Sequence, residues 1–252
     1  MPLSLATLRA RIARLEHPPA ALRLAPLRFG LAPIDDALPG GGLARGALHE
    51  VAGLGAALDH GAAAALFIAV LLARAPGPVL WVAERADLFA PALAAAGLAP
   101  ERVIQAEAGR GEDVLAALED GLRHSALLAG VGEISGRLSL TASRRLALAA
   151  AASGVTGFVL RRPWRAEAAA LDAPSAALTR WRVGAAPSAP PFPDAPDVPG
   201  LGPPRWRVEL WRARGGVPMS FIMEACDGQG RLRLVAVGED GPAAAGRERA
   251  AG

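Results

Sequence analysis

The chain has 252 residues, 52% of them apolar, with a formal net charge of +3, and all 27 of its basic side chains are arginine. This length and apolar content predict one packed globular domain. The single cysteine excludes an internal disulfide framework and is typical of a reducing compartment. The longest apolar stretch, residues 61–73, is shorter than the roughly 20 residues that cross a bilayer. Because the N-terminus also lacks the apolar run of a secretory signal, we expect a cytoplasmic protein with no membrane partner.

The charge is unevenly distributed along the chain. Residues 1–133 carry 11 arginines and 14 acidic residues, whereas residues 134–234 carry 14 arginines and seven acidic residues. The basic half is compatible with a surface for nucleic acid or for an acidic protein, and equally with a solvated sheet face.

Residues 1–20 are predicted to form a short helix and a linker. Ser4 can cap the helix, and its apolar residues repeat at steps of three and four, which gives a narrow apolar seam. The seam consists of Leu5, Leu8, Ile12 and Leu15. The prolines that follow end the helix, so it has to dock on its own core or on another chain. These four residues are therefore the candidate partner-binding residues.

Strand-like and helix-like segments alternate from residue 48 to residue 160, after a short helical piece at residues 34–38. The expected strands are 49–52, 79–83, 103–106, 126–131 and 155–160, and the expected helices are 59–74, 86–96, 112–124 and 140–153. Such alternation predicts an α/β fold with a mostly parallel central sheet flanked by helices.

The last third of the chain changes character. Four further strands are expected at 179–183, 205–212, 219–225 and 231–237, and turn signals predict that the later ones pair antiparallel. Residues 185–204 contain eight prolines and predict an irregular loop. Residues 239–252 are polar and rich in alanine and glycine, which predicts a disordered tail.

Residues 48–74 have the order of a strand, a glycine-containing turn and a helix, which is where nucleotide-binding folds hold their phosphate loop. A working loop reads G-x-x-x-x-G-K-[ST]. Counted from Gly53, this chain has Leu58 for the second glycine, Asp59 for the lysine and His60 for the hydroxyl residue. A carboxylate repels polyphosphate, and imidazole is a poor ligand for magnesium. We therefore expect no cofactor and no metal site, although weak nucleotide binding without hydrolysis stays open.

Three short series of residues carry a family resemblance. They are Phe29-Gly30-Leu31 with Ile34-Asp35 and Leu38, then Gly41-Gly42-Leu43-Ala44-Arg45-Gly46, then His49-Glu50-Val51-Ala52-Gly53. Their order resembles the recombinase core of RecA over residues 25–238. Together with residues 131–134 and 212–218, it resembles more closely the ImuA family, a degenerate relative grouped with RecA and SulA. The resemblance implies a RecA-like core preceded by an N-terminal helix.

The same resemblance implies a role in the bacterial SOS response. It implies a non-catalytic accessory protein of translesion DNA synthesis and mutagenesis. The implied partners are an ImuB-like inactive Y-family polymerase homologue and, through it, an error-prone C-family polymerase, with RecA as a further candidate. The N-terminal helix of recombinases packs on a neighbouring subunit, so a homo-oligomer is also compatible with the resemblance.

Glu84 follows the expected strand 79–83, where recombinases keep the carboxylate that activates the attacking water. The expected strand 126–131 ends near Gly130 without the aspartate that would organise magnesium, and Glu133, three residues later, is expected to be structural. Together with the degenerate loop, these positions predict that Glu84 is vestigial and that the chain has no catalytic residue.

The densest basic cluster is Arg161, Arg162, Trp164 and Arg165. Arginine and tryptophan can bind phosphates and stack on bases, so these are the candidate nucleic-acid residues. The same residues also fit a rim in which one aromatic side chain anchors a helix.

Two other functions are compatible with the same sequence. One is a SulA-like cell-division inhibitor that binds the division GTPase directly. The other is a residual DNA-dependent ATPase related to RecA, in which Glu84 would still act as the base.

Overall fold

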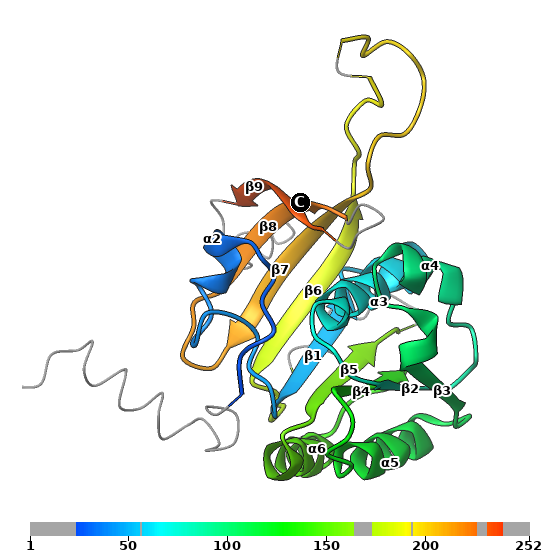
Figure 1. Cartoon of the computed structure of the whole chain (residues 1–252), viewed down its shortest axis with the longest axis vertical. Coiled ribbons are helices and arrows are strands. Elements are labelled where there is room, and N and C mark those ends of the chain that lie inside the picture. The colour runs from blue at the N-terminus through cyan, green and yellow to red at the C-terminus, as the bar shows by residue number, and fades with distance from the viewer. Residues whose placement is uncertain (1–23, 56, 164–172, 193, 226–230, 239–252) are drawn as a thin grey trace, which may run out of the picture.

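The computed structural model describes residues 24–55, 57–163, 173–192, 194–225 and 231–238 (Figure 1). The predicted N-terminal helix with Leu5, Leu8, Ile12 and Leu15 and the predicted disordered tail, residues 239–252, lie outside these ranges.

The described residues form one nine-stranded sheet in the order β3-β2-β4-β5-β1-β6-β7-β8-β9 (Figure 1). The strands are β1 (Leu48–Gly53), β2 (Val79–Ala83), β3 (Val103–Glu107), β4 (Ala129–Ile134), β5 (Thr156–Arg161), β6 (Thr179–Ala186), β7 (Arg205–Ala213), β8 (Met219–Glu224) and β9 (Arg233–Gly238). The pairs among β1 to β6 are parallel, and β6 to β9 pair antiparallel. The predicted mixed sheet with antiparallel C-terminal strands is confirmed.

Helices cover both faces of the parallel part of the sheet. The described helices are α2 (Ala32–Asp35), α3 (Ala57–Ala73), α4 (Ala90–Ala95), the 3-10 helix η1 (Pro100–Arg102), α5 (Gly111–Leu122) and α6 (Leu140–Ser153). Of these, α3 packs on one face of the parallel strands, and α5 and α6 pack on the other. The core on the α3 side also includes residues of α4 and of the antiparallel strands, and a second core lies under α5 and α6. Figure 1 shows these two sets of helices on opposite faces of the sheet. A strand that is covered on both faces consists of a continuous run of apolar residues, which is why the sequence alone predicts β2.

Two predicted elements differ clearly from the structure. β4 begins at Ala129 and ends at Ile134, rather than spanning 126–131, because residues 124–127 close a turn through the Leu127 N–H to the His124 carbonyl. The helix expected over 86–96 is reduced to α4, which starts at Ala90 with Pro91 in its first turn. Proline favours the first turn of a helix, because its ring fixes φ and it has no N–H to leave unpaired there.

The Phe29-Gly30-Leu31 and Ile34-Asp35 series packs the segment before β1 against the core. The Asp35 carboxylate accepts hydrogen bonds from the Phe29 N–H at 2.7 Å and the Gly30 N–H at 3.0 Å. This turn needs glycine at position 30, where φ is +71°. The Phe29 ring packs against Phe67 of α3 and Trp181 of β6, with ring centroids 5.6 and 5.4 Å away. These residues therefore attach the described segment before β1 to the core.

His49 of β1 belongs to a buried chain of hydrogen bonds. Its Nε2–H donates to the Ala44 carbonyl at 2.8 Å, and its Nδ1 accepts from the Thr179 hydroxyl at 2.7 Å. The same hydroxyl accepts from the Trp181 Nε1–H at 2.7 Å. Burial lowers the pKa of His49 to about 4, because a charged imidazole would lose its hydration, although the hydrogen bond to Ala44 opposes the shift. His49 is therefore neutral in the folded protein at pH 7.

Glu50, the next residue, lies between two arginines in the core under α6. Its Oε2 is 2.9 Å from Arg180 Nε on β6, and its Oε1 is 3.4 Å from Arg161 Nη1 on β5. All three side chains are at most 4% exposed. Burial lowers the pKa of the Arg161 guanidinium, and the Glu50 charge opposes this. One carboxylate thus links the three central strands.

The C-terminal end of α3 depends on Arg102 of η1. Its guanidinium donates to the carbonyls of Leu72, Ala75 and Gly77 at 3.1, 2.5 and 3.0 Å. Carbonyls at a helix end have no partner within the helix, and a cation there also interacts favourably with the helix dipole.

Replacing Arg102 with alanine is expected to lower the free energy of unfolding by about 1–3 kcal/mol, because half-buried carbonyls lose a charged donor. Urea unfolding followed by circular dichroism measures the difference. Arg110→Ala is the control, because its side chain is 73% exposed and pairs only with exposed acids. Equal unfolding midpoints for the two variants would contradict the role given to Arg102.

Candidate functional site

The candidate phosphate loop lies between the carboxyl end of β1 and the start of α3. β1 ends at Gly53 and α3 begins at Ala57, so the strand, turn and helix order predicted for this segment is present. The Leu54 N–H donates to the Val183 carbonyl of β6 at 3.0 Å, which ties the loop to the neighbouring strand. The loop therefore sits at the carboxyl edge of the parallel sheet, where open α/β folds bind their ligands.

His60 fills the space that the loop encloses. A Cβ placed on Gly53 would lie 3.0 Å from His60 Cβ, one on Gly55 would lie 3.1 Å from Cδ2, and one on Gly184 would lie 3.2 Å from Nδ1. Its Nδ1 also accepts a hydrogen bond from the Ala185 N–H at 3.3 Å. The imidazole thus lies beside Gly55 and Gly184, and the His60 Cβ lies beside Gly53.

The other two substituted loop positions lie in the first turn of α3. Asp59 is exposed there, and Leu58 belongs to the same turn, with its side chain outside the described residues. A carboxylate at a helix N-terminus is favoured by the helix dipole, and it disfavours a phosphate at the same end. His60 thus occupies space beside the loop, and Asp59 places a negative charge at the N-terminus of α3.

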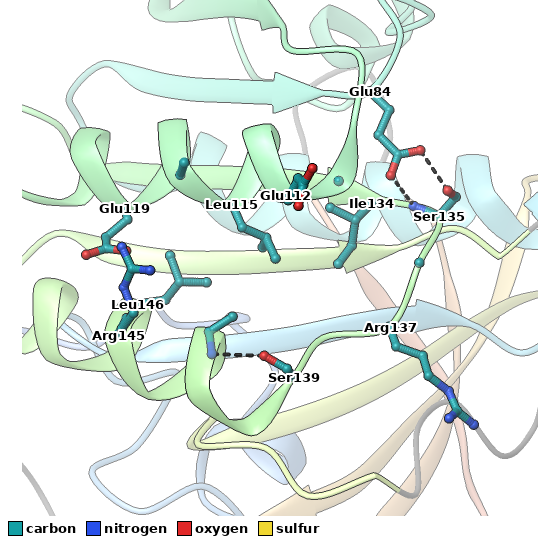
Figure 2. A pocket seen from close by; sticks show the side chains of 14 residues that line it. Glu84, Glu112, Leu115, Glu119, Ile134, Ser135, Arg137, Ser139, Arg145 and Leu146 are labelled. Atoms are coloured by element: carbon teal, nitrogen blue, oxygen red, sulfur yellow. Dashed lines mark hydrogen bonds and ion pairs between the residues drawn. The ribbon is translucent and has the colours of Figure 1, made fainter.

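Glu84, just beyond β2, is held by the loop between β4 and α6. Its carboxylate accepts from the Ser135 N–H at 3.0 Å and from the Ser135 hydroxyl at 2.7 Å. These bonds fix the orientation of the carboxylate at the end of β4 (Figure 2). A carboxylate oxygen can accept more than one hydrogen bond, so the two bonds from Ser135 set the direction of the Glu84 carboxylate without occupying all of its acceptor sites.

Glu133 lies within β4 and not beyond its end. Its Oε2 accepts from the Trp81 Nε1–H at 3.3 Å, and its Oε1 pairs with Arg162, which also contacts Asp87 at 3.1 Å. Burial raises the pKa of Glu133, while the nearby Arg162 opposes that shift. The structural role expected for Glu133 agrees with these contacts, whereas the expected strand end near Gly130 is wrong.

The candidate nucleic-acid cluster is divided by the fold. Arg161 is only 2% exposed and is bound to Glu50, so its guanidinium is a core group that cannot reach a phosphate. Arg162 is 27% exposed on its side chain and carries the two acidic partners just described. Trp164 and Arg165 fall in the segment 164–172, outside the described residues. The sequence could not separate these arginines, because only the register of β5 decides which one faces inward.

Sequence reasoning missed a pocket between α5 and α6 (Figure 2). It has a volume of about 550 Å³. It extends from Glu84, just beyond β2, and Ile134, at the end of β4, to Glu119 of α5 and Arg145 of α6. Its apolar lining includes Leu115, Ile134 and Leu146. No sequence signal marked it, because it forms where two helices diverge above a strand end.

Two further properties concern the described part of the chain alone. No group of three or more histidine, cysteine, aspartate or glutamate side chains there has an arrangement that could hold a metal ion. None of the helices in those ranges combines the length and the apolar character needed to cross a membrane.

Two curated proteins match most of the chain. Protein ImuA of Caulobacter vibrioides strain NA1000 / CB15N is 46% identical over 207 residues, which are 79% of this chain and 83% of that protein. Protein ImuA of C. vibrioides strain ATCC 19089 / CIP 103742 / CB 15 gives the same values. No protein-family model matches the chain.

Among solved structures, the crystal structure of the RadB recombinase matches with a TM-score of 0.55 at 16% identity, over 83% of this chain and 100% of that one. At this identity the likeness concerns the fold. It confirms the predicted RecA-like core.

Proposed function

The chain belongs to the ImuA family, and on this premise we propose that it is a non-catalytic, RecA-like accessory protein of SOS-induced translesion DNA synthesis and mutagenesis. The observation that carries the proposal is the similarity to Protein ImuA over most of both chains, combined with a phosphate loop whose interior is filled by His60.

Three features support the absence of nucleotide turnover. The chain contains no lysine, so no ammonium is present to bind a terminal phosphate. Asp59 stands where that charge would be needed, and His60 fills the loop with an imidazole. Glu84, the remaining candidate base, is hydrogen bonded to Ser135. The missing cation at the phosphate loop is the strongest of these, because phosphoryl transfer depends on positive charge around the transferred group.

We further propose that the protein acts by assembling partners. The proposed partners are an ImuB-like inactive Y-family polymerase homologue, and through it an error-prone C-family polymerase. RecA and DNA are further candidates, the latter through Trp164 and Arg165. Support for a protein partner comes from the apolar seam Leu5, Leu8, Ile12 and Leu15, because a short helix of this kind is stable only when its apolar face is buried.

The test is to isolate the tagged full chain from DNA-damaged cells and to identify the proteins that co-purify. A variant lacking residues 1–20 serves as the comparison. Recovery of an inactive Y-family polymerase homologue with the full chain, and its loss with the shorter variant, supports both the function and the proposed contact. Recovery of the division GTPase instead would indicate a SulA-like inhibitor and contradict the proposal.

Glu84→Ala is expected to leave damage-induced mutagenesis within about twofold of the parent, because the proposed function uses no catalytic base. Mutation frequencies after ultraviolet irradiation measure this, with protein levels compared by immunoblotting. The matched comparison is Glu112→Ala, a glutamate of the same pocket that is 73% exposed and is paired with the exposed Arg110.

A loss of mutagenesis with Glu84→Ala alone, at unchanged protein level, would contradict a non-catalytic role. A DNA-stimulated ATPase activity of the purified chain that disappears in this variant would do the same, and would indicate a residual ATPase.

A further inference from the structure

The described residues between β6 and β7, 187–192 and 194–204, form an arm that extends away from the sheet (Figure 1). The two legs of the arm lie against each other. The Gly202 N–H donates to the Ala189 carbonyl at 3.1 Å, and a Cβ on Gly202 would lie 2.2 Å from that oxygen. A Cβ on Gly200 would lie 2.9 Å from Cγ of Pro191. Glycine at these two positions therefore allows the legs to close.

The tip of the arm consists of two consecutive turns. The Ala195 N–H donates to the Phe192 carbonyl, and the Val198 N–H donates to the Ala195 carbonyl, both at 3.1 Å. The sequence repeats across these turns as x-Pro-Asp-x, and proline and aspartate both favour β-turns. Apolar residues therefore occupy the ends of both turns, and an aspartate occupies the third position of each.

The large apolar side chains of the arm are open to solvent. Phe192 is 56% exposed, Val198 43% and Leu201 90%. Single exposed apolar residues are common on protein surfaces, but here three fall within residues 192–201 of one projecting arm. Because burial of apolar surface is favourable, a partner that covers these side chains gains binding free energy.

The arm carries only negative charge. Asp194 and Asp197 are the two charged residues in the range 187–204, and both are exposed. They repel the phosphates of nucleic acid and of an anionic membrane. A protein surface with an apolar groove and basic side chains beside it complements both the charge and the apolar residues of the arm.

Prolines restrict the arm before it binds. The range 187–204 contains eight of them, and each proline ring fixes φ. Fewer backbone conformations are therefore lost on binding than for a flexible loop. Proline-rich segments are recognised in apolar grooves for this reason. The arm is thus suited to bind as a preformed ligand.

We propose that the arm is a docking peptide that inserts into an apolar groove with a basic rim on a protein partner. Phe192 and Leu201 fill the groove, and Asp194 and Asp197 pair with its rim. The partner is the ImuB-like polymerase homologue, a choice that rests on the function proposed above. Relatives of DNA polymerases fit this chemistry, because a surface that holds DNA phosphates is basic. The arm is then a second contact, in addition to the predicted N-terminal helix.

The test is the affinity of the purified full chain for the immobilised inactive Y-family polymerase homologue of the same organism, measured by biolayer interferometry. Phe192→Ser with Leu201→Ser is expected to weaken binding by at least about tenfold, because a few buried apolar anchors dominate such interfaces. Asp194→Arg with Asp197→Arg is expected to weaken it most at low salt, where charges are least screened.

The matched control is Leu148→Ser with Val217→Ser. These two apolar residues, on α6 and in the turn between β7 and β8, are each 71% exposed. This variant is expected to bind like the parent. All these substitutions replace exposed side chains, so each variant is expected to unfold at the urea concentration of the parent.

Three outcomes would overturn the inference. Equal affinities of the parent and of the Phe192→Ser, Leu201→Ser variant would refute the docking role and leave the proposed function in place. A parent chain that does not bind the homologue at all would refute both. A dimer of the parent that this variant loses in sedimentation would assign the arm to a second copy of the chain.

Discussion

Replacing Glu50 with glutamine is expected to lower the free energy of unfolding by about 3–5 kcal/mol, the range typical of breaking one partner of a buried ion pair. The substitution keeps the shape of the side chain but removes the one carboxylate that contacts both Arg161 and Arg180. Both guanidinium groups stay buried in the core beneath α6, where an uncompensated charge is costly. Urea unfolding of both chains at pH 7 measures the difference.

The control for this prediction is Glu112→Gln, which removes an exposed carboxylate paired with an exposed arginine. Surface changes of this kind are usually within about 0.5 kcal/mol. If Glu50→Gln unfolds at the same urea concentration as Glu112→Gln, the Glu50 cluster contributes no net stability.

Lowering the pH from 7 to 4 is expected to remove about 3 kcal/mol of stability through His49 alone, at about 1.4 kcal/mol per unit of pKa difference. The unfolded imidazole binds a proton near pH 6.5, whereas burial lowers the pKa of the folded one to about 4. The unfolded state therefore binds more protons between these values, so stability is full above pH 6.5 and falls as the pH decreases toward 4.

Comparison with His49→Asn isolates this contribution. The variant is less stable at pH 7, because it loses part of the hydrogen-bond chain through Thr179. Its free energy of unfolding is nevertheless expected to depend less on pH between 6.5 and 4. Glu133, whose pKa burial raises, contributes a slope of the opposite sign in both chains and cancels in the difference. Parallel pH profiles for the two chains would refute the assignment to His49.

Both predictions concern residues of the His49–Gly53 series, by which the sequence resembles the recombinases. His49 and Glu50 come directly before the degenerate loop, and both hold β1 to its neighbours. In the described structure both side chains are buried in the core. A chain can therefore keep this part of the motif for stability while Asp59 and His60 replace the residues that bind phosphate.

The sequence by itself determined the order of the elements. The runs that became β2 and α6 were predicted with their observed ends, because a buried strand reads as a continuous apolar run and α6 carries its own N-cap at Ser139 and a terminal glycine at Gly154. The loss of the phosphate-binding lysine and hydroxyl could also be recognised there, since it depends only on residue types at fixed spacing.

Only the tertiary structure decided what the side chains contact. Arg161 and Arg162 are adjacent in sequence, yet one pairs with Glu50 in the core and the other with Glu133 near the surface, because successive residues of a strand point to opposite faces. Likewise, the insertion of His60 among Gly53, Gly55 and Gly184 depends on how β6 packs beside the loop. The α5–α6 pocket is lined by residues of two helices and by the end of β4, which are distant in sequence. Local sequence determines the periodicity and the caps that define each helix and strand. The side-chain contacts form between residues that are distant in sequence, and only the fold brings these together.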